Sequence, residues 1–430
     1  MSTPNLTSYL LDALWSLTQC LSCFPSSPLL TLNSKPYKIL RLLGEGGFSY
    51  VYLVQSPPSP QLYALKKIRC PFGAESVRQA MKEVEAYKLF EGSGYIINSV
   101  DHAVVADKGA RSGGFGAGSG DEGAKTVYIL LPYYRRGNLQ DGINANLVNG
   151  SRFPERRLMV LFKGVCEGLR EMHEYRVRKG GRKKARGVRR EAEREGGART
   201  GHEDREEQGE GFLENEAGLA SEGREEGEVR SYAHRDIKPG NIMISDDGTT
   251  PVLMDLGSLS PSPTPITSRA LALQVQDTAA EHSTMPYRAP ELFDVKTDTV
   301  IDTKVDIWSL GCTLYACLVG KSPFEARSEE TGGSLSLCVL GGDWRFPDDD
   351  ANGSVKSRGK QAVSPGGSGR ADGSAEGAKK GAGISESVKE VVRKCLRVEP
   401  SERPDVGELI RLVDEVIEGL PEDENGVVDD

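Results

Sequence analysis

Two patterns of apolar residues divide the chain into a strand-rich first part and a helix-rich second part. Alternating or continuous apolar runs, typical of strands, cover 37–55, 62–68 and 127–132. Apolar residues at three- and four-residue steps, typical of amphipathic helices, occur at 75–90, 155–175, 384–396 and 406–419. We therefore predict an α+β protein in which a small antiparallel sheet is followed by a larger, mainly helical part.

Three polar stretches interrupt these patterns. They are rich in Gly, Ser or charged residues and cover 106–125, 176–230 and 348–383. Such segments cannot bury enough apolar area to fold alone, so we interpret them as disordered insertions. The basic half of 176–230 could also imitate a nuclear signal or bind acidic lipid. With a hydrophobic fraction of 37% in 430 residues, insertions in one core fit the composition better than several equal domains.

The first 36 residues form a separate segment. Leucines recur at helical steps through residues 5–24, and Cys20 and Cys23 lie at the end of that stretch. We interpret it as an amphipathic helix that associates with a membrane, with reversible palmitoylation of both cysteines. The alternative is a helix docked on the folded core with two ordinary thiols. Ser2 excludes N-terminal myristoylation, which requires a glycine at that position.

Charge and cysteine usage exclude several classes of protein. The formal net charge of −9 argues against a general nucleic-acid binder. The eight cysteines show no disulfide framework, and the five histidines show no zinc-ligand spacing. Uninterrupted apolar runs long enough to span a bilayer are absent from the sequence, and the first 34 residues lack the Lys and Arg of secretory or mitochondrial signals. We expect a cytoplasmic protein that binds no nucleic acid.

Residues 232–241 read Tyr-Ala-His-Arg-Asp-Ile-Lys-Pro-Gly-Asn, which is the strongest chemical signal in the chain. Asp236, Lys238 and Asn241 follow one another in the order that phosphoryl transfer from ATP to a hydroxyl requires. In this interpretation Asp236 orients the hydroxyl and accepts its proton, Lys238 neutralises charge on the phosphate, and Asn241 binds magnesium. The alternative is a chance turn at Pro239 and Gly240 between charged residues.

A glycine-rich segment between two expected strands predicts a phosphate-binding turn. Glycines let backbone N–H groups approach phosphates without side-chain obstruction. The candidate ATP-binding residues of this segment are Leu43, Gly44, Glu45, Gly46, Gly47, Phe48, Ser49, Tyr50 and Val51. Ser49 replaces the third glycine of the usual pattern, and an ordinary glycine-containing hairpin is the alternative.

Lys66 is the candidate lysine for the α- and β-phosphates of ATP. The spacing of Ala64 and Lys66 in a strand is the register in which the lysine reaches these phosphates. In the helix expected next, Glu83 and Glu85 compete as its ion-pair partner. We prefer Glu83 because the apolar residues around it then face inward, and a surface glutamate is the alternative.

Three further residues complete the expected nucleotide site. Asp255, in Asp255-Leu256-Gly257, is expected to bind the metal ion that bridges the β- and γ-phosphates, with Leu256 where Phe is usual. Leu131 is expected to border the adenine pocket, and Tyr133 follows where a linker to a second lobe would lie.

Residues 257–289 are expected to form the segment that binds substrate. Residues 268–282 have helical propensity, so we predict an additional helix there. Thr284 is expected to contact Asp236, and Glu291 to form a buried ion pair with Arg403. Asp306 is expected to begin the central helix of the larger part.

Together these motifs resemble the eukaryotic protein-kinase family. The resemblance is carried by 43–51, 232–236, 251–258, 287–293 and 306–311. Within that family the chain is similar to the Numb-associated kinases, and in particular to a fungal-type member of the branch of the myristoylated and palmitoylated serine/threonine kinase. The resemblance covers nearly all of 37–418 outside the insertions. It implies an N-lobe at 37–132 and a C-lobe at 135–418, and an acidic tail follows at 419–430.

The resemblance implies a bilobal kinase fold and transfer of phosphate from ATP, with Mg²⁺ or Mn²⁺, to Ser or Thr of protein substrates. It also implies autophosphorylation and residence on the cytosolic face of Golgi or vacuolar membranes. Ser2 and the insertion at 176–230 depart from the branch. The competing hypothesis is a membrane-attached scaffold that only binds partners, although Lys66, Asp236 and Asp255, which inactive kinases commonly lose, are all present.

Overall fold

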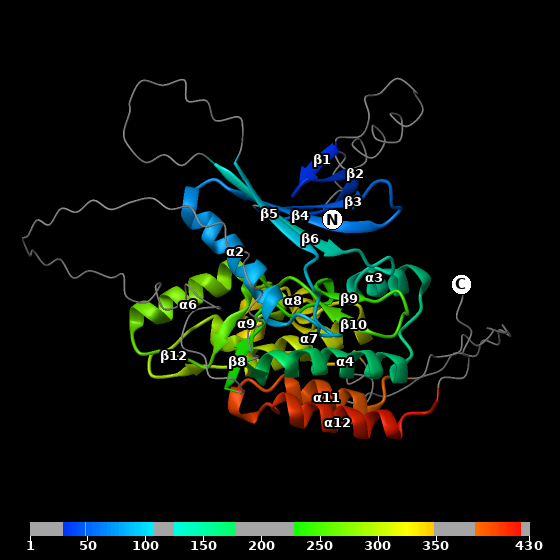
Figure 1. Ribbon diagram of the computed structural model, residues 1–430. Helices are drawn as coiled ribbons and strands as arrows, with labels where there is room; N and C mark the ends of the chain where they lie inside the picture. The colour runs from blue at the N-terminus through cyan, green and yellow to red at the C-terminus, as the bar shows by residue number, and fades with distance from the viewer. Residues whose placement is uncertain (1–28, 48, 107–123, 178–227, 348–382, 423–430) are drawn as a thin grey trace, which may run out of the picture. The chain divides into compact units, whose positions relative to one another are not determined.

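The computed structural model describes residues 29–47, 49–106, 124–177, 228–347 and 383–422. Two compact units make up the chain, one of 1–84 with 98–133 and the other of 85–97 with 134–430. Figure 1 shows strands dominating the first unit and helices the second, which confirms the expected α+β class. Phe48, Cys20 and Cys23 lie outside the described residues.

The first unit is a six-stranded antiparallel sheet with the order β1-β2-β3-β4-β6-β5. A cluster of side chains from five of its strands forms its core, namely Leu32, Tyr37, Val54, Leu65 and Leu130. The strands are β1 (Leu29–Leu32), β2 (Lys35–Glu45), β3 (Ser49–Gln55), β4 (Leu62–Cys70), β5 (Asp101–Ala106) and β6 (Lys125–Pro132). Helix α2 (Gly73–Leu89) follows β4, and the division between the units falls within it.

The sheet begins before residue 37, where the sequence patterns placed the start of the domain. Strand β1 pairs with the beginning of β2, and the turn between them uses Asn33 and Ser34 at φ values of 46° and 66°. The Asn33 side chain donates hydrogen bonds of 2.9 Å to Asp101 Oδ1 and to the carbonyl of His102, both in β5. A short Asn-Ser turn between apolar residues is the sequence signal for this hairpin.

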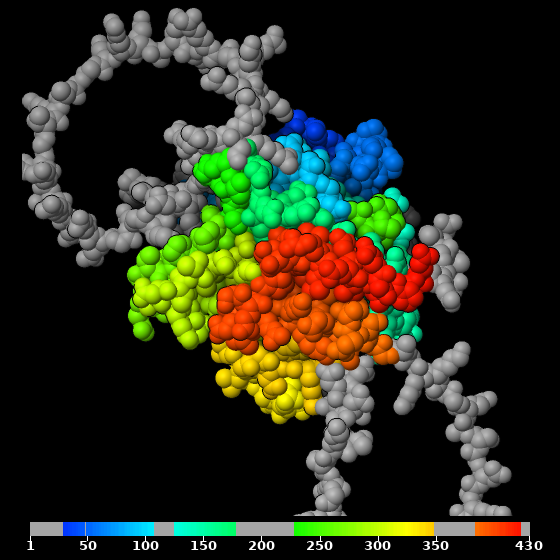
Figure 2. All heavy atoms as spheres, turned by 90° about the horizontal axis from the view of Figure 1, so that it is seen from below, coloured from blue at the N-terminus to red at the C-terminus, as the bar shows by residue number. Residues whose placement is uncertain are grey.

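The second unit is built around α7 (Lys304–Val319), whose residues are buried from Val305 to Leu318. Trp308 of this helix stacks on Phe324 with the ring centroids 5.3 Å apart. Figure 2 shows α11 and α12 side by side on one face of this unit. The other helices of the unit that the structure describes are α3 (Leu139–Asn149), α4 (Glu155–His173), α6 (Arg269–His282), α8 (Pro323–Thr331), α9 (Leu335–Gly341), α11 (Glu386–Cys395) and α12 (Val406–Gly419).

The long insertion starts and ends on neighbouring strands. Strand β7 (Tyr175–Arg176) pairs antiparallel with β8 (Val229–Ala233), and the Val177 N–H donates to the Glu228 carbonyl at 2.9 Å, so the two described residues that flank the insertion lie next to each other. This pairing explains how the fold accommodates the insertion. The insertion was expected to cover 176–230, but Arg176 belongs to β7, and Val229 and Arg230 belong to β8. Among the helices that the structure describes, none combines the length and the apolar character needed to cross a bilayer.

Candidate active site

The loop that follows β8, residues 234–241, is anchored by a buried carboxylate. Asp306, in the first turn of α7, accepts hydrogen bonds of 2.8 Å from the backbone N–H groups of His234 and Arg235. The ring of His173, at the end of α4, lies 3.0 Å from the same carboxylate. Complete burial by itself raises the pKa of Asp306, but the hydrogen bonds and the charges of the two histidines outweigh it and lower this pKa below its ordinary value.

Asp236 lies at the centre of a hydrogen-bonded cluster. Its Oδ1 accepts hydrogen bonds from the backbone N–H of Thr284 at 2.9 Å and from the Thr284 hydroxyl at 2.8 Å. Its Oδ2 accepts from Lys238 Nζ at 2.8 Å and from Asn241 Nδ2 at 3.0 Å. Lys238 Nζ also donates to Thr284 Oγ1 at 2.7 Å. The three expected catalytic side chains and Thr284 are therefore brought together.

The donors around Asp236 use the whole hydrogen-bonding capacity of its carboxylate. A carboxylate has about four lone-pair positions, and four donors occupy them here. A substrate hydroxyl that binds Asp236 must therefore replace one of these donors. The side chain of Lys238 is 28% exposed, so it can turn from Asp236 toward a phosphate.

Asn241 and Asp255 provide oxygen donors close to this cluster. The Met254 N–H, one residue before Asp255, donates to the carbonyl of Asn241 at 3.0 Å. Asp255 has a φ of 60°, an uncommon conformation for a residue other than glycine. Because Nδ2 of Asn241 binds Asp236, the amide oxygen of Asn241 is left for another partner. Amide and carboxylate oxygens are the ligands that Mg²⁺ prefers, so the two residues fit a divalent cation.

Two side chains to which the sequence motifs assigned no role, Ser258 and His234, join residues 254–258 to the loop before Asp236. The Ser258 hydroxyl donates to the carbonyl of His234 at 2.6 Å. The His234 Nε2 lies 3.1 Å from the carbonyl of Met254. The position of Ser258 directly after Asp255-Leu256-Gly257 was an available signal. His173 carries no such signal, because its contact with Asp306 joins residues far apart in the sequence.

In the first unit, Lys66 of β4 forms an ion pair with Glu83 of α2. Both carboxylate oxygens of Glu83 lie 2.9 Å from Lys66 Nζ. The two side chains are 14% and 5% exposed, so the pair is largely shielded from water. This contact settles the choice between Glu83 and Glu85 as the partner.

The glycine-rich segment joins β2 and β3 as an antiparallel hairpin. Glu45 pairs with Tyr50, and the Gly46 N–H donates to the Ser49 carbonyl at 2.8 Å. A Cβ on Gly46 would lie 3.1 Å from Ser49 Oγ, whereas one on Gly47 would meet no atom within 4 Å. The turn therefore leaves open space at Gly47, as a backbone that approaches phosphates requires.

The expected adenine-site residues lie on neighbouring strands of the same sheet. Ala64 of β4 is the register partner of Leu131 in β6, and Leu131 is buried. Tyr133 directly follows β6, and its hydroxyl accepts a hydrogen bond of 3.5 Å from Arg41. Their roles toward adenine stay predictions.

The segment 257–289, which the sequence predicts to bind substrate, is held in place at both ends of α6. Ser268 caps the start of this helix, which forms over the residues that the sequence predicted. After its end, the buried guanidinium of Arg288 donates to Ser283 Oγ at 2.7 Å and to the Ser283 carbonyl at 3.0 Å. A cation at a helix C-terminus is favourable because it faces unpaired carbonyls. The sequence analysis did not identify Arg288.

Glu291 and Arg403 form the buried ion pair that was expected. The two Arg403 Nη atoms donate to Glu291 Oε1 at 2.7 Å and to Oε2 at 2.9 Å. The Arg403 guanidinium also lies over the Trp308 ring, 5.0 Å from its centroid. This pair joins the end of the substrate-binding segment to α7.

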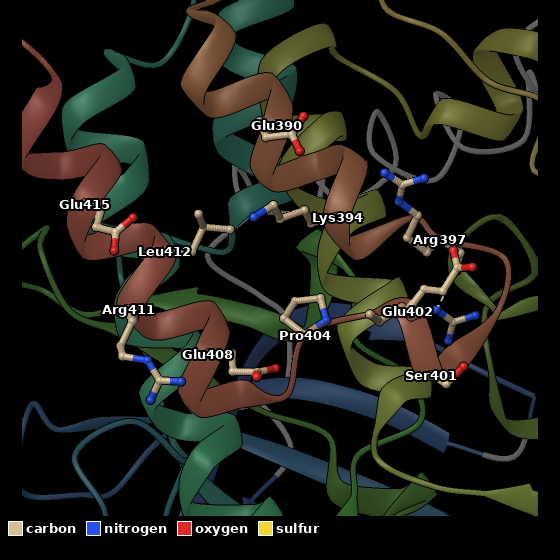
Figure 3. A pocket seen from close by; sticks show the side chains of 11 residues that line it. Glu390, Lys394, Arg397, Ser401, Glu402, Pro404, Glu408, Arg411, Leu412 and Glu415 are labelled. Carbon is tan, nitrogen blue, oxygen red and sulfur yellow. Dashed lines mark hydrogen bonds between the residues drawn. The ribbon is translucent and has the colours of Figure 1, made fainter.

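A concavity of about 670 Å³ lies between α11 and α12 (Figure 3). Lys394 extends from α11 toward Leu412 of α12, while Glu408 and Glu415 line the side formed by α12. Charges of both signs occur on both walls. The groove therefore selects no single ligand chemistry, and its lining includes none of the side chains around Asp236.

Comparison with known proteins agrees with this geometry. The protein kinase domain family matches residues 37–179 and 229–412. Serine/threonine-protein kinase ENV7 of Saccharomyces cerevisiae is 34% identical over 91% of this chain and 94% of its own length. Serine/threonine-protein kinase ppk13 of Schizosaccharomyces pombe is 33% identical over 78% of this chain and 87% of its own length. Human serine/threonine-protein kinase 16 is 30% identical over 74% of this chain and 80% of its own length.

The family match leaves out residues 180–228, which nearly coincide with the insertion between β7 and β8. It includes the glycine-rich segment, Lys66 and the cluster around Asp236. The comparisons also confirm the resemblance to the branch of kinases inferred from the motifs. The chain belongs to the protein kinase family, and it is a serine/threonine protein kinase.

Proposed function

We propose that the cluster around Asp236 transfers the γ-phosphate of ATP to serine and threonine hydroxyls of other proteins. Asp236 orients the incoming hydroxyl and accepts its proton, while Lys238 neutralises charge on the phosphoryl oxygens. The observation that carries this proposal is the position of Lys238 Nζ, which bridges the Asp236 carboxylate and the Thr284 hydroxyl. A cation and a proton acceptor are thereby held together where phosphoryl transfer needs both.

The remaining site residues are proposed to bind the nucleotide. Asn241 and Asp255 would hold Mg²⁺, or Mn²⁺, which neutralises phosphate charge when bound. Lys66, oriented by Glu83, would bind the α- and β-phosphates, and backbone N–H groups of 43–51 would cover the phosphates. The side chains of Ala64, Leu131 and Tyr133 would border adenine.

The test is transfer of labelled γ-phosphate from ATP by the wild type and by Asp236→Asn, assayed in parallel with Mg²⁺ and with Mn²⁺. The wild type is expected to label Ser or Thr, and Asp236→Asn to lose about 100- to 10,000-fold of the rate while still binding ATP. Near wild-type rates in Asp236→Asn would contradict the role of Asp236. Bound ATP without transfer by either protein would instead favour the scaffold hypothesis.

We also propose that the enzyme phosphorylates itself. The hydroxyl of Thr284 contacts Asp236, and further hydroxyls lie on the same segment 257–289, which supports this proposal. Diluting the enzyme distinguishes transfer within one molecule from transfer between two molecules. A rate per molecule that is independent of enzyme concentration indicates transfer within one molecule. Label that appears only with an added active kinase, and not in the purified enzyme, would contradict autophosphorylation.

A further part of the proposal concerns location. The helical spacing of leucines in residues 5–24, with Cys20 and Cys23, supports palmitoylation and attachment to a membrane. The resemblance to the branch of the myristoylated and palmitoylated kinase supports the cytosolic face of Golgi or vacuolar membranes as the location. Cys20→Ser with Cys23→Ser is expected to move the protein from the membrane fraction to the supernatant. Hydroxylamine, which cleaves thioesters, should release the wild type equally. Unchanged sedimentation in both experiments would contradict this anchor.

A further inference from the structure

Four side chains form a continuous row on one face of the sheet in the first unit. Tyr50 of β3 is the register partner of Lys67 in β4, and Lys67 is in turn the partner of Tyr128 in β6. Side chains of directly opposed residues are neighbours on the same face. Arg69, two residues beyond Lys67, lies over the Tyr50 ring with its Cζ 5.2 Å from the centroid. We call Tyr50, Lys67, Arg69 and Tyr128 the outer row.

The outer row lies on the face of the sheet opposite the proposed nucleotide-binding lysine. Successive side chains of a strand point to opposite faces. Lys66 points to Glu83 of α2, so Lys67 points to the other face. A partner bound to the outer row would therefore leave Lys66 uncovered.

The first residues that the structure describes lie on this same face. Leu30 of β1 packs against the core cluster that includes Leu65, and Tyr128 of the outer row packs against the same cluster. Leu65 lies two positions before Lys67 in β4, so both side chains share one face. Residues 1–28 are therefore joined to the sheet on the face that carries the outer row.

The chemistry of the outer row fits the surface of an acidic bilayer. Arg69 is exposed, and the other three side chains are half-buried. Neither Lys67 nor Arg69 forms an ion pair with a residue that the structure describes. One carboxylate, that of Glu45 opposite Tyr50, borders the row, which keeps a net positive charge. Tyrosines and unpaired cations are the residue types that favour a membrane surface containing acidic lipid.

We propose that the outer row contacts acidic lipid headgroups of the bilayer to which residues 5–24 attach. This inference rests on the proposed attachment of that segment. Five residue steps separate Phe24 from Leu29, which limits the connection to about 18 Å. A surface tethered this close to the bilayer meets it at a high effective concentration, so weak contacts are sufficient. This proximity favours the bilayer over an acidic protein as the occupant.

The test is binding of the full chain, purified without acyl groups, to vesicles of phosphatidylcholine with phosphatidylserine. Lys67→Gln with Arg69→Gln is expected to lose about 30-fold of the wild-type affinity, as the removal of two cations at an acidic surface predicts. Lys67→Arg with Arg69→Lys keeps both charges and should retain the affinity. Vesicles of phosphatidylcholine alone should bind the wild type and the Gln variant equally.

Lys296→Gln with Arg411→Gln is the matched control, because it removes the same charge from exposed positions of the second unit. This control should bind the acidic vesicles as the wild type does. The basic residues of 176–190 are present in every variant, so the comparison isolates the outer row. Equal affinities of the outer-row variant and the control would overturn the inference.

Labelling of lysines with an amine-reactive reagent provides a second measurement. Acidic vesicles should protect Lys67 and leave Lys296 reactive. Protection of Lys67 without vesicles would show that another part of the chain covers the row, and would also overturn the inference. Because the vesicle assay contains no acyl groups, its result is independent of palmitoylation. Failure of the proposed anchor would appear instead in the experiment with Cys20→Ser and Cys23→Ser.

Discussion

The buried carboxylate of Asp306 binds the backbone N–H of Arg235 at 2.8 Å, one residue before Asp236. Arg235 has a φ of 67°, a conformation that residues other than glycine adopt only when their surroundings stabilise it. The adjacent N–H of His234 binds the same carboxylate. Helix α7 therefore anchors the backbone just before Asp236 through the Asp306 side chain.

Asp306→Asn is expected to destabilise the folded protein at pH 7 by about 3 to 5 kcal/mol, since it removes one charge from a buried network. The pKa of Asp306 is lowered from its ordinary value of 3.8 in the folded state, so its ionised form stabilises the fold above pH 3.8. That contribution is lost as the pH falls below 3.8. Urea unfolding of both proteins between pH 7 and pH 3 should show the difference shrinking at the acidic end.

A constant difference across this pH range would contradict the electrostatic role of Asp306. Asp302→Asn is a suitable control, because Asp302 lies just before α7 and is only half-buried. Its unfolding free energy should stay within about 1 kcal/mol of the wild type.

Glu83→Gln is expected to lower kcat/KM for ATP by about 10- to 100-fold, because Lys66 loses the partner that fixes its ammonium group. Glu85→Gln in the same helix is the matched control, since Lys66 contacts Glu83 and not its neighbour. Steady-state kinetics with varied ATP concentration would measure kcat/KM for ATP in both variants. Equal losses in the two variants would indicate a general effect on α2.

Thr284→Val is expected to reduce kcat by about 10- to 100-fold, as the loss of charge-assisted hydrogen bonds predicts. The substitution keeps the shape of the side chain but removes the hydroxyl that joins Asp236 to Lys238. Thr284→Ser keeps the hydroxyl and should retain most of the activity. Similar rates for the Val and Ser variants, measured by phosphate transfer, would show that the hydroxyl is dispensable.

Arg403→Lys is expected to lower the unfolding free energy by about 3 kcal/mol, because lysine cannot bind both Glu291 oxygens and the nearby carbonyls. For a domain of this size the melting temperature should fall by roughly 6 to 12 °C. Calorimetry would compare the melting temperature of Arg403→Lys with that of Arg411→Lys, a control at an exposed position on α12. A melting temperature of Arg403→Lys equal to that of the control would contradict a stabilising role for the pair.

The sequence by itself determined the type and order of the main elements and the candidate catalytic residues. Strand and helix periodicities are local properties, and so is the spacing of Asp236, Lys238 and Asn241 within one loop. For this reason the helix α6 and the strand that carries Lys66 could be predicted closely. The hairpin of β1 and β2 was missed because four residues are too short to show a clear period.

Only the tertiary structure decided which distant residues meet. Glu83 and Glu85 are nearly equivalent in a helical pattern, and the packing of α2 against the sheet places Glu83 within reach of Lys66. The contact between His173 and Asp306 joins residues that the chain separates by 133 positions. Such pairings depend on how helices pack, and packing is set by the combined burial of many side chains that no local pattern contains.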